Sequence, residues 1–388
     1  MSLWEGLTGQ AEAIAVLEAA ASSSALGSTG ESSMTHSWLI TGPPGSGRSN
    51  IAYAFAAALL GTRGEETEES VYKQVVARTH PDLSVLSTER VIISIDEVRK
   101  LVASSQFSPS VGHYRVMIIE DADRMVERTS NVLLKALEEP PPRTVWILCA
   151  PSEADLIPTI RSRVRSVRLR TPAIEDVAQL LQDRDGVAPD IALRAAREAQ
   201  SHIGMAHRLA TNAEARERRE RALTTVLNIR TVSDAVIAAS SLLELAKADA
   251  AAITEEKDAQ ERESALRSLG VAPGGTVPPA LRVQLKNLEE DQKRRATRSL
   301  RDGIDRIMVD LLSLYRDILL TQIGAPGELI NLSIVNNLMS VANRTTAPST
   351  LAIMDGIAEA RRRIESNVAP ALALEAMLVK VAVSGRGA

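Results

Sequence analysis

The sequence contains a single cysteine, Cys149, only 2% aromatic residues and no long apolar run. One cysteine excludes a disulfide framework, and no cluster of cysteine and histidine predicts a zinc site. No apolar run reaches the roughly 20 residues that a membrane-spanning helix needs, and Met1 is not followed by a basic and apolar leader. We therefore expect a cytoplasmic protein without zinc and without membrane association.

The chain also lacks a strong charge of either sign, with a formal net charge of -4 over 388 residues. Any binding of nucleic acid must come from a local basic patch, because the overall charge is not basic. The length allows two or three domains. Because aromatic residues are scarce, the cores must consist of Ala, Leu, Ile and Val, a composition that favours helices.

One segment has the pattern of a phosphate-binding loop. The apolar run 38–40 predicts a strand, the residues 50–60 predict a helix, and the loop between them has the spacing G-x-x-x-x-G-[K]-[ST]. Arginine stands where lysine is expected, and its planar fork does not fit the position of the lysine point charge beneath the phosphates. The candidate nucleotide-binding residues of this loop are Gly42, Gly45, Gly47, Arg48 and Ser49.

Three interpretations of the loop stay open: a tight turn kept for packing, a vestigial phosphate site, and a working ATPase site with unusual residues. Ser49 retains the hydroxyl that would reach Mg²⁺, and the glycines retain the cradle of backbone N–H groups. Weak binding of ATP or ADP with Mg²⁺ is compatible with this loop, whereas we expect turnover to be lost. No cofactor is expected to be required.

Strands and helices alternate over residues 1–171. The apolar run 116–119 ends in Glu120 and Asp121, which predicts a buried parallel strand with carboxylates at the edge where ligands bind. The strand signal disappears at Pro172, and beyond residue 213 the pattern is helical. We predict an α/β P-loop domain with a parallel sheet at 1–171, a small helical lid at 172–212 and an all-α domain at 213–388.

Three segments, taken together, are similar to one family. They are GPPGSGRS, RVMIIEDADRM followed by NVLLKALEEPPPRTVWIL, and PTIRSRVRSVRL. On these motifs the chain resembles the AAA+ clamp-loader family of bacterial DNA polymerase III, and within it the delta-prime subunits. The resemblance is strong over 1–170, fair over the lid, and weak beyond, where LYRDIL is similar to part of the family's collar domain. It implies an AAA+ nucleotide-binding-like domain, a lid and an oligomerising collar.

The resemblance implies a subunit of a pentameric ring that helps to load the sliding clamp onto primed DNA. The implied partners are ATP-hydrolysing clamp-loader subunits, a delta subunit and primer-template DNA, with the clamp contacted indirectly. Delta-prime subunits present an arginine finger to a neighbour's ATP site, and Arg163 takes this position, with Arg161 as the nearest competitor. The alternatives are a solvated or salt-bridging face of an edge strand, and contact of Arg165 and its neighbours with DNA phosphates.

The resemblance further predicts that the chain has no intrinsic ATPase activity. Glu120 stands where the family has its Mg-holding aspartate and Asp121 where it has its water-activating glutamate, so the two acids are swapped. A shortened base sits further from the attacking water, which lowers the rate. The alternative is a self-sufficient AAA+ ATPase with a variant P-loop.

Two further positions of the hydrolytic site are altered. Ser152 is the best candidate for the residue that senses the γ-phosphate, and Gly204 replaces the phosphate-contacting arginine of the lid, with His207 and Arg208 as nearby alternatives. Many relatives carry a four-cysteine zinc module where this chain has residues 61–80, so His80 is expected to be a turn residue. The charged stretches 255–263 and 289–301 are expected to be solvated helical faces, with partner or DNA binding as the alternative.

Overall fold

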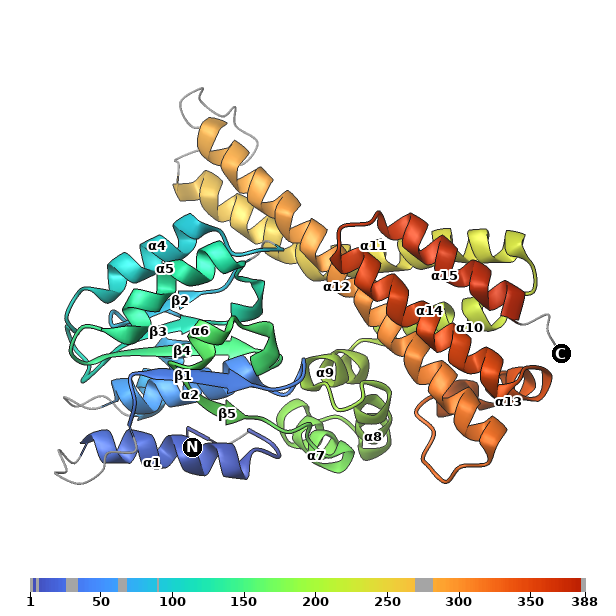
Figure 1. The fold of residues 1–388 in the computed structure, drawn as a ribbon, viewed down its shortest axis with the longest axis horizontal. Helices are drawn as coiled ribbons and strands as arrows, with labels where there is room; N and C mark the ends of the chain where they lie inside the picture. Colours follow the sequence, from blue (N-terminus) through green and yellow to red (C-terminus); the bar gives the residue numbers. More distant parts are fainter. Residues whose placement is uncertain are drawn as a thin grey trace. The chain divides into compact units, whose positions relative to one another are not determined.

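The computed structural model describes residues 3–4, 7–25, 34–61, 68–88, 91–268 and 282–384. Two compact units follow one another in the chain, Met1–Thr211 and Asn212–Ala388 (Figure 1). The first holds the sheet and the second is built of helices. The predicted fold class, an α/β P-loop domain with a parallel sheet followed by helices, is thus confirmed. The boundary between sheet domain and lid at 171–172 stays a prediction.

The sheet of the first unit has five strands in the order β2-β3-β4-β1-β5, and every neighbouring pair is parallel. The central strands β1 and β4 are completely buried, as expected for parallel strands that helices cover on both faces. All carboxyl ends therefore meet at one edge. The strands are β1 Ser37–Thr41, β2 Leu83–Leu86, β3 Arg115–Ile119, β4 Thr144–Ala150 and β5 Arg165–Arg168.

Alternate residues of β1 enter two separate cores. Trp38 and Ile40 face α1–α3, where the Trp38 ring meets the edge of Phe55 at 5.2 Å, while Leu39 faces α4 and α5. These helices lie on opposite sides of the sheet (Figure 1). They are α1 Ala11–Ala25, α2 Arg48–Leu60, α3 Glu68–Val76, α4 Ile95–Ser105, α5 Glu127–Glu138 and the single turn α6 Pro158–Arg161.

Two helix beginnings test the sequence analysis. Ser94 followed three residues later by Glu97 predicts a capped helix start, and the two residues form a reciprocal capping box at the start of α4, which confirms it. The sequence pattern also predicts a helix from Asn131 to Glu139, and this start is wrong, since α5 already begins at Glu127. Its first turns bury Thr129 and Ser130, two polar residues that hide the apolar stripe in the sequence.

Three helices end the first unit: α7 Ile174–Asp185, α8 Pro189–Glu198 and α9 Ile203–Thr211. Gly186 ends α7 in the left-handed conformation at φ 65°, which glycine adopts without strain. Asp185 connects α7 to α9 by accepting hydrogen bonds from Arg184 and from His207 Nδ1. These bonds, chiefly that of Arg184, lower the pKa of Asp185 to about 2.

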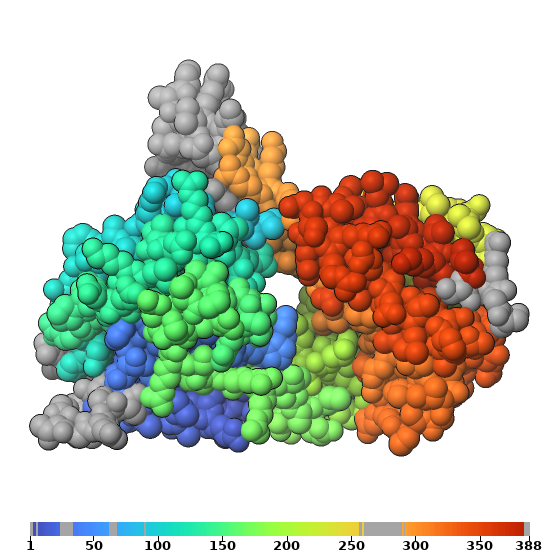
Figure 2. Space-filling view, viewed as in Figure 1, coloured from blue at the N-terminus to red at the C-terminus, as the bar shows by residue number. Residues whose placement is uncertain are grey.

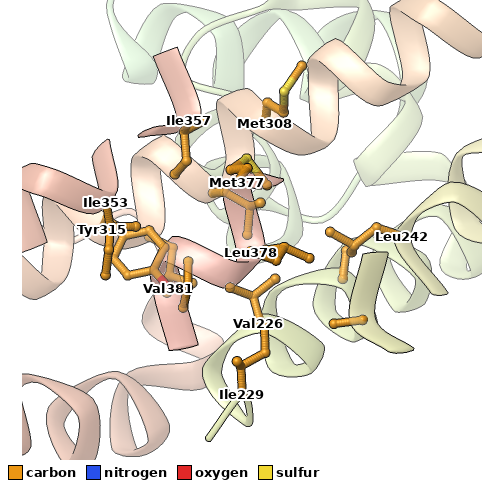
Figure 3. Packing of buried hydrophobic residues seen from close by; sticks show 14 of the residues in the cluster. Val226, Ile229, Leu242, Met308, Tyr315, Ile353, Ile357, Met377, Leu378 and Val381 are labelled. Atoms are coloured by element: carbon orange, nitrogen blue, oxygen red, sulfur yellow. The ribbon is translucent and has the colours of Figure 1, made fainter. Parts of the chain in front are cut away.

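The second unit is a helical bundle around one large core. Side chains from α10, α11, α12, α14 and α15 converge in it, among them Met308, Tyr315 and Leu378 (Figure 3). Residues of α14 and α15 form a contiguous part of this unit's visible surface (Figure 2, red). The helices are α10 Ala213–Leu227, α11 Val232–Ser268, α12 Arg282–Ile323, α13 Val335–Arg344, α14 Ala347–Glu365 and α15 Pro370–Ser384.

The apolar residues of 304–319 recur at the i, i+3, i+4, i+7 spacing that predicts a core-facing helix, and on α12 Ile304, Leu311 and Ile318 are at most 1% exposed, as this spacing predicts. The charged stretch 255–263 belongs to α11, and 289–301 belongs to α12. Arg295 and Asp258 form an ion pair with 2.5 Å between Nη1 and Oδ1, so these stretches meet one another at one point at least. The Gly and Pro content of residues 270–279 predicts a loop, and this segment lies outside the described residues.

Candidate nucleotide site and rim arginine

The phosphate loop lies between β1 and α2, as the sequence predicted. Gly45 and Gly47 have φ of 81° and 89°, values that glycine adopts readily and other residues rarely do. Gly47 is the N-cap of α2, which begins at Arg48. The loop therefore has the geometry that presents backbone N–H groups at a helix N-terminus to an anion.

The side chain of Arg48 bends back into this loop. Its Nη1 donates a hydrogen bond to the carbonyl oxygen of Gly42, the first residue of the loop. A guanidinium in this place bonds to the chain's own backbone and does not reach toward a β- or γ-phosphate. The hydroxyl of Ser46 is buried, and no described residue lies within hydrogen-bonding distance of it. The loop therefore keeps its phosphate-binding backbone geometry, but the guanidinium of Arg48 points back to the loop's own backbone.

Glu120 and Asp121 follow β3 at the carboxyl edge of the sheet, as predicted, but other side chains hold them. The Tyr53 hydroxyl donates to Glu120 Oε1, and Arg78 Nη2 donates to Oε2 at 3.1 Å. Arg78 Nε also donates to the Tyr53 hydroxyl at 3.1 Å, which closes a three-membered network. Burial, and after it the bond to Glu120, raises the pKa of Tyr53. Asp121 lies 3.8 Å from Arg124 Nε.

Asp123 is an acidic group near this site that the sequence analysis missed. Burial raises the pKa of Asp123, with the neighbouring charge of Asp121 as a further cause. The acids at this edge are therefore in different environments: Glu120 is held by a phenol and a guanidinium, whereas burial raises the pKa of Asp123. No spacing in the sequence distinguishes these environments, because Tyr53 lies on α2 and Arg78 in the turn after α3, both far along the chain from Glu120.

The start of α9 packs directly on the phosphate loop. Ile203 N donates to the carbonyl oxygen of Gly45 at 3.3 Å, and the ring of His202 lies so close that a Cβ on Gly45 would stand 2.2 Å from it. Gly45 is therefore required twice, for its φ and for this contact. The sequence analysis missed His202 because only tertiary packing brings it to the loop.

The other predicted phosphate sensors have local partners. Ser152 caps a short 3-10 helix, and its Oγ accepts from Ala154 N at 3.2 Å. Gly204 has no side chain to offer, and His207 is paired with Asp185 at 2.8 Å. Ser152 and His207 therefore bond to residues outside the phosphate loop, and Gly204 supplies no side chain at all. Whether they sense a phosphate stays a prediction.

Arg163 lies just beyond α6 and is one third exposed, with 32% of its side chain accessible. Its Nε donates to Glu138 Oε1 at 2.7 Å, and Nη2 donates to the same oxygen. Nη1 donates to the Thr159 carbonyl at 2.7 Å and to Ser162 Oγ at 3.1 Å. The guanidinium is thus ordered at the surface and does not point into the core.

The neighbouring arginines have different environments. Arg165 packs its guanidinium 5.0 Å from the centre of the Trp38 ring, and Arg170 pairs with Glu12 at 2.8 Å. Arg161 and Arg168 are exposed. Together with the first loop residues and the ends of β4 and β5, the side chains of Arg161, Arg168 and Arg170 line a cleft of about 1100 Å³. Glu12 and Glu153 also line this cleft, so its charged lining is mixed, with three arginines and two glutamates.

His80 is a buried turn residue, as predicted, because its Nδ1 accepts a hydrogen bond from Asp82 N at 3.2 Å. Within the described ranges no group of three or more His, Cys, Asp and Glu side chains could hold a metal ion. Cys149 is buried at the end of β4, and burial raises the pKa of its thiol to about 12. Among the described residues, no helix is long and apolar enough to cross a bilayer.

Asp82 is completely buried and anchors the loop before β3. Its carboxylate accepts from the backbone N–H groups of Ser110, Val111 and Gly112 at 2.6–2.7 Å. Burial opposes the charge, yet these bonds lower the pKa of Asp82 below its usual value. Its stabilising effect is therefore present above about pH 4 and is lost as the pH falls through the lowered pKa.

We expect Asp82→Asn to lower the free energy of unfolding at pH 7 by about 2–3 kcal/mol, because an amide leaves one of these buried donors without an acceptor. Urea denaturation at pH 7 and pH 3 measures the effect, and the deficit should shrink at pH 3. Asp96→Asn is the control, since Asp96 is 77% exposed. A variant as stable as the control at pH 7 would contradict this role.

The geometry and the comparisons with known proteins agree. Residues 19–173 match a family model described as DNA polymerase III, delta subunit. The chain is 36% identical over 140 residues to the DNA polymerase III subunit delta' of Pseudomonas aeruginosa, which covers 34% of this chain and 43% of that protein. With the subunit delta' of Escherichia coli it is 29% identical over 177 residues, or 44% of this chain and 53% of that one.

Two more distant likenesses complete the comparison. A DNA polymerase III subunit gamma/tau of Mycobacterium tuberculosis is 26% identical over 168 residues, which covers 41% of this chain and 29% of that protein. A DNA polymerase III gamma subunit-related protein of Thermotoga maritima superposes with a TM-score of 0.37 at 18% identity, over 90% of this chain and 95% of that chain. The matched part of this chain spans about half the length, or less, of its curated relatives.

A parallel sheet with a phosphate loop between β1 and α2, followed by three short helices and a helical unit, is the architecture of a P-loop protein. Over part of its length the chain is similar to the delta' and gamma/tau subunits of DNA polymerase III, and its residues 19–173 match the model of that polymerase's delta subunit. Over its N-terminal part it is similar to the delta-prime subunits, and the resemblance predicted from the motifs is confirmed.

Proposed function

We propose that the chain is a non-hydrolysing subunit of the clamp loader of DNA polymerase III. In this role it helps to load the sliding clamp onto primed DNA and lends Arg163 to the ATP site of a neighbouring subunit. Its proposed partners are ATP-hydrolysing clamp-loader subunits and a delta subunit in a pentameric ring, with primer-template DNA. The second unit serves as the collar of this ring, and the site of action is the cytoplasm.

The loss of hydrolysis rests on one observation above all: the charged groups of the chain's own nucleotide site are bonded to one another or to the backbone. Arg48 donates to the carbonyl of Gly42, and Glu120 is held by Tyr53 and Arg78. Binding of Mg-ATP in the usual way would require Glu120 to exchange these partners for the metal ion and Arg48 to leave the loop. Weak binding of ATP or ADP is compatible with the cradle, but the parts that drive turnover are engaged elsewhere.

The lending of an arginine rests on the position of Arg163. An arginine finger needs a guanidinium at the surface, held in a defined orientation, that a neighbour's triphosphate can reach. Arg163 is accessible and ordered by hydrogen bonds, in the segment that resembles the finger motif of the family. Arg165 is less suited, because its guanidinium packs on Trp38.

The purified chain is expected to hydrolyse no ATP above the rate of its Ser49→Ala variant. The reason is that Arg48 donates to the loop's own backbone and is not available to a phosphate, while Glu120, at the position of the metal-holding acid, is already bonded to Arg78. Phosphate release under saturating Mg-ATP measures this. Hydrolysis by the purified chain that Ser49→Ala abolishes would instead support a self-sufficient ATPase with a variant P-loop.

A further inference from the structure

Arg163 is bound by a carboxylate from a different element. Glu138 is the last residue of α5, whereas Arg163 follows α6, 25 residues later in the chain. Leu137 and Ile160, which precede these two residues, are fully buried, so both backbones are anchored in the core. The side chains therefore meet between two fixed points and not at the ends of mobile segments.

The contacts of Arg163 leave part of its guanidinium available. A guanidinium has five N–H donors. Nε and one N–H of Nη2 go to Glu138, and Nη1 serves the Thr159 carbonyl and Ser162 Oγ. The second N–H of Nη2 has no acceptor among the described residues. A phosphate oxygen of a neighbouring molecule can take this donor without breaking any of the four bonds.

This pair is poorly placed to stabilise the fold. The side chains of Arg163 and Glu138 are 32% and 46% exposed, and solvent weakens ion pairs at such positions. A charged pair that contributes little to folding still fixes an orientation, since a planar fork bound along one edge has lost most of its rotational freedom. The orientation of Arg163 is therefore what Glu138 determines.

We infer that Glu138 is a positioning residue for Arg163: it holds the Nε edge of the guanidinium so that the remaining Nη2 donor is presented to the triphosphate of an adjacent subunit. This inference rests on the proposed function. Glu138 touches no substrate itself and acts only through Arg163. Because a displacement on the order of 1 Å in a group that stabilises a transition state can cost about a hundredfold in rate, loss of this grip is expected to be measurable.

The test uses the assembled complex of the full-length chain with its lysine-bearing P-loop partners, and measures steady-state ATP hydrolysis. Glu138→Ala is expected to lower kcat about tenfold with the KM for ATP unchanged. Glu138→Gln, which keeps an acceptor oxygen at the same place, should restore most of the rate. Added to Arg163→Ala, the Glu138→Ala change should have no further effect.

Glu139→Ala is the matched control, because Glu139 is the next residue, is exposed, and has no side-chain role in this pair. An unchanged kcat in Glu138→Ala, or a faster one, overturns the inference while the proposed function stands, provided that Arg163→Ala lowers the rate. An Arg163→Ala complex as fast as the wild type overturns the proposed function itself. An equal loss in the Glu139→Ala control would show a general defect of α5 and also overturn the inference.

Discussion

Replacing Arg163 by alanine is expected to lower the rate of ATP hydrolysis of the assembled complex by about 10³-fold, because a finger guanidinium neutralises charge that develops on the transferred phosphoryl group. The complex itself should still assemble, since Arg163 is a surface residue whose own pair with Glu138 is partly exposed. Steady-state phosphate release measures the rate, and size-exclusion chromatography measures the assembly.

Arg161→Ala is the control for this experiment. Arg161 lies two residues away, is exposed, and carries the same charge. Its loss lowers the net charge of the surface around α6 by the same amount as the loss of Arg163, so a general electrostatic effect would slow both variants. If Arg161→Ala is the slower of the two, Arg161 is the finger, and if neither variant is slower than the wild type, neither Arg161 nor Arg163 serves a neighbour's site.

The sequence predicted those parts of the structure that local patterns encode. The runs of apolar residues at 38–40, 116–119 and 144–149 predict the three central strands, because strands covered on both faces need no polar alternation. Because the carboxyl ends of parallel strands meet at one edge, the sequence also predicts that the acids after β3 and the loop before α2 lie at the same edge of the sheet. Parallel pairing of the strands is therefore enough to predict where the site lies.

The state of the site could not be predicted, because it depends on contacts between distant segments. Tyr53 and Arg78 reach Glu120 across 67 and 42 residues, and no periodicity marks either as a partner. His202 meets Gly45 only through the packing of α9 on the loop. The motif gave the identity of Arg48 but not the direction of its side chain. The residue types were readable from the sequence, whereas their partners were decided by tertiary packing.

The second unit shows the same limit at a buried polar cluster. Asp317 of α12 is completely buried among apolar neighbours, in a stripe that the sequence analysis treated as a core-facing helix. Its Oδ2 accepts from Ile330 N at 2.9 Å and from Asn331 N at 2.8 Å, and Oδ1 accepts from Arg316 at 2.9 Å. Asn331 Oδ1 in turn accepts from Arg219 of α10 at 2.7 Å. One carboxylate therefore fixes both the turn after α12 and, through Asn331, a third segment.

Asp317→Ala is expected to lower the free energy of unfolding of the second unit by about 3–5 kcal/mol, because the backbone N–H groups of Ile330 and Asn331 lose their acceptor and the Asn331 amide keeps only Ser313 Oγ. Chemical denaturation of the chain followed by circular dichroism measures this, because the helices of the second unit lose their signal when it unfolds. Asp305→Ala is the matched control: Asp305 also lies on α12 and pairs with Arg361, but its side chain is 46% exposed, so a loss of at most about 1 kcal/mol is expected. Equal losses in the two variants would mean that burial does not determine how much these carboxylates contribute to the free energy of unfolding, and the role given to Asp317 would be wrong.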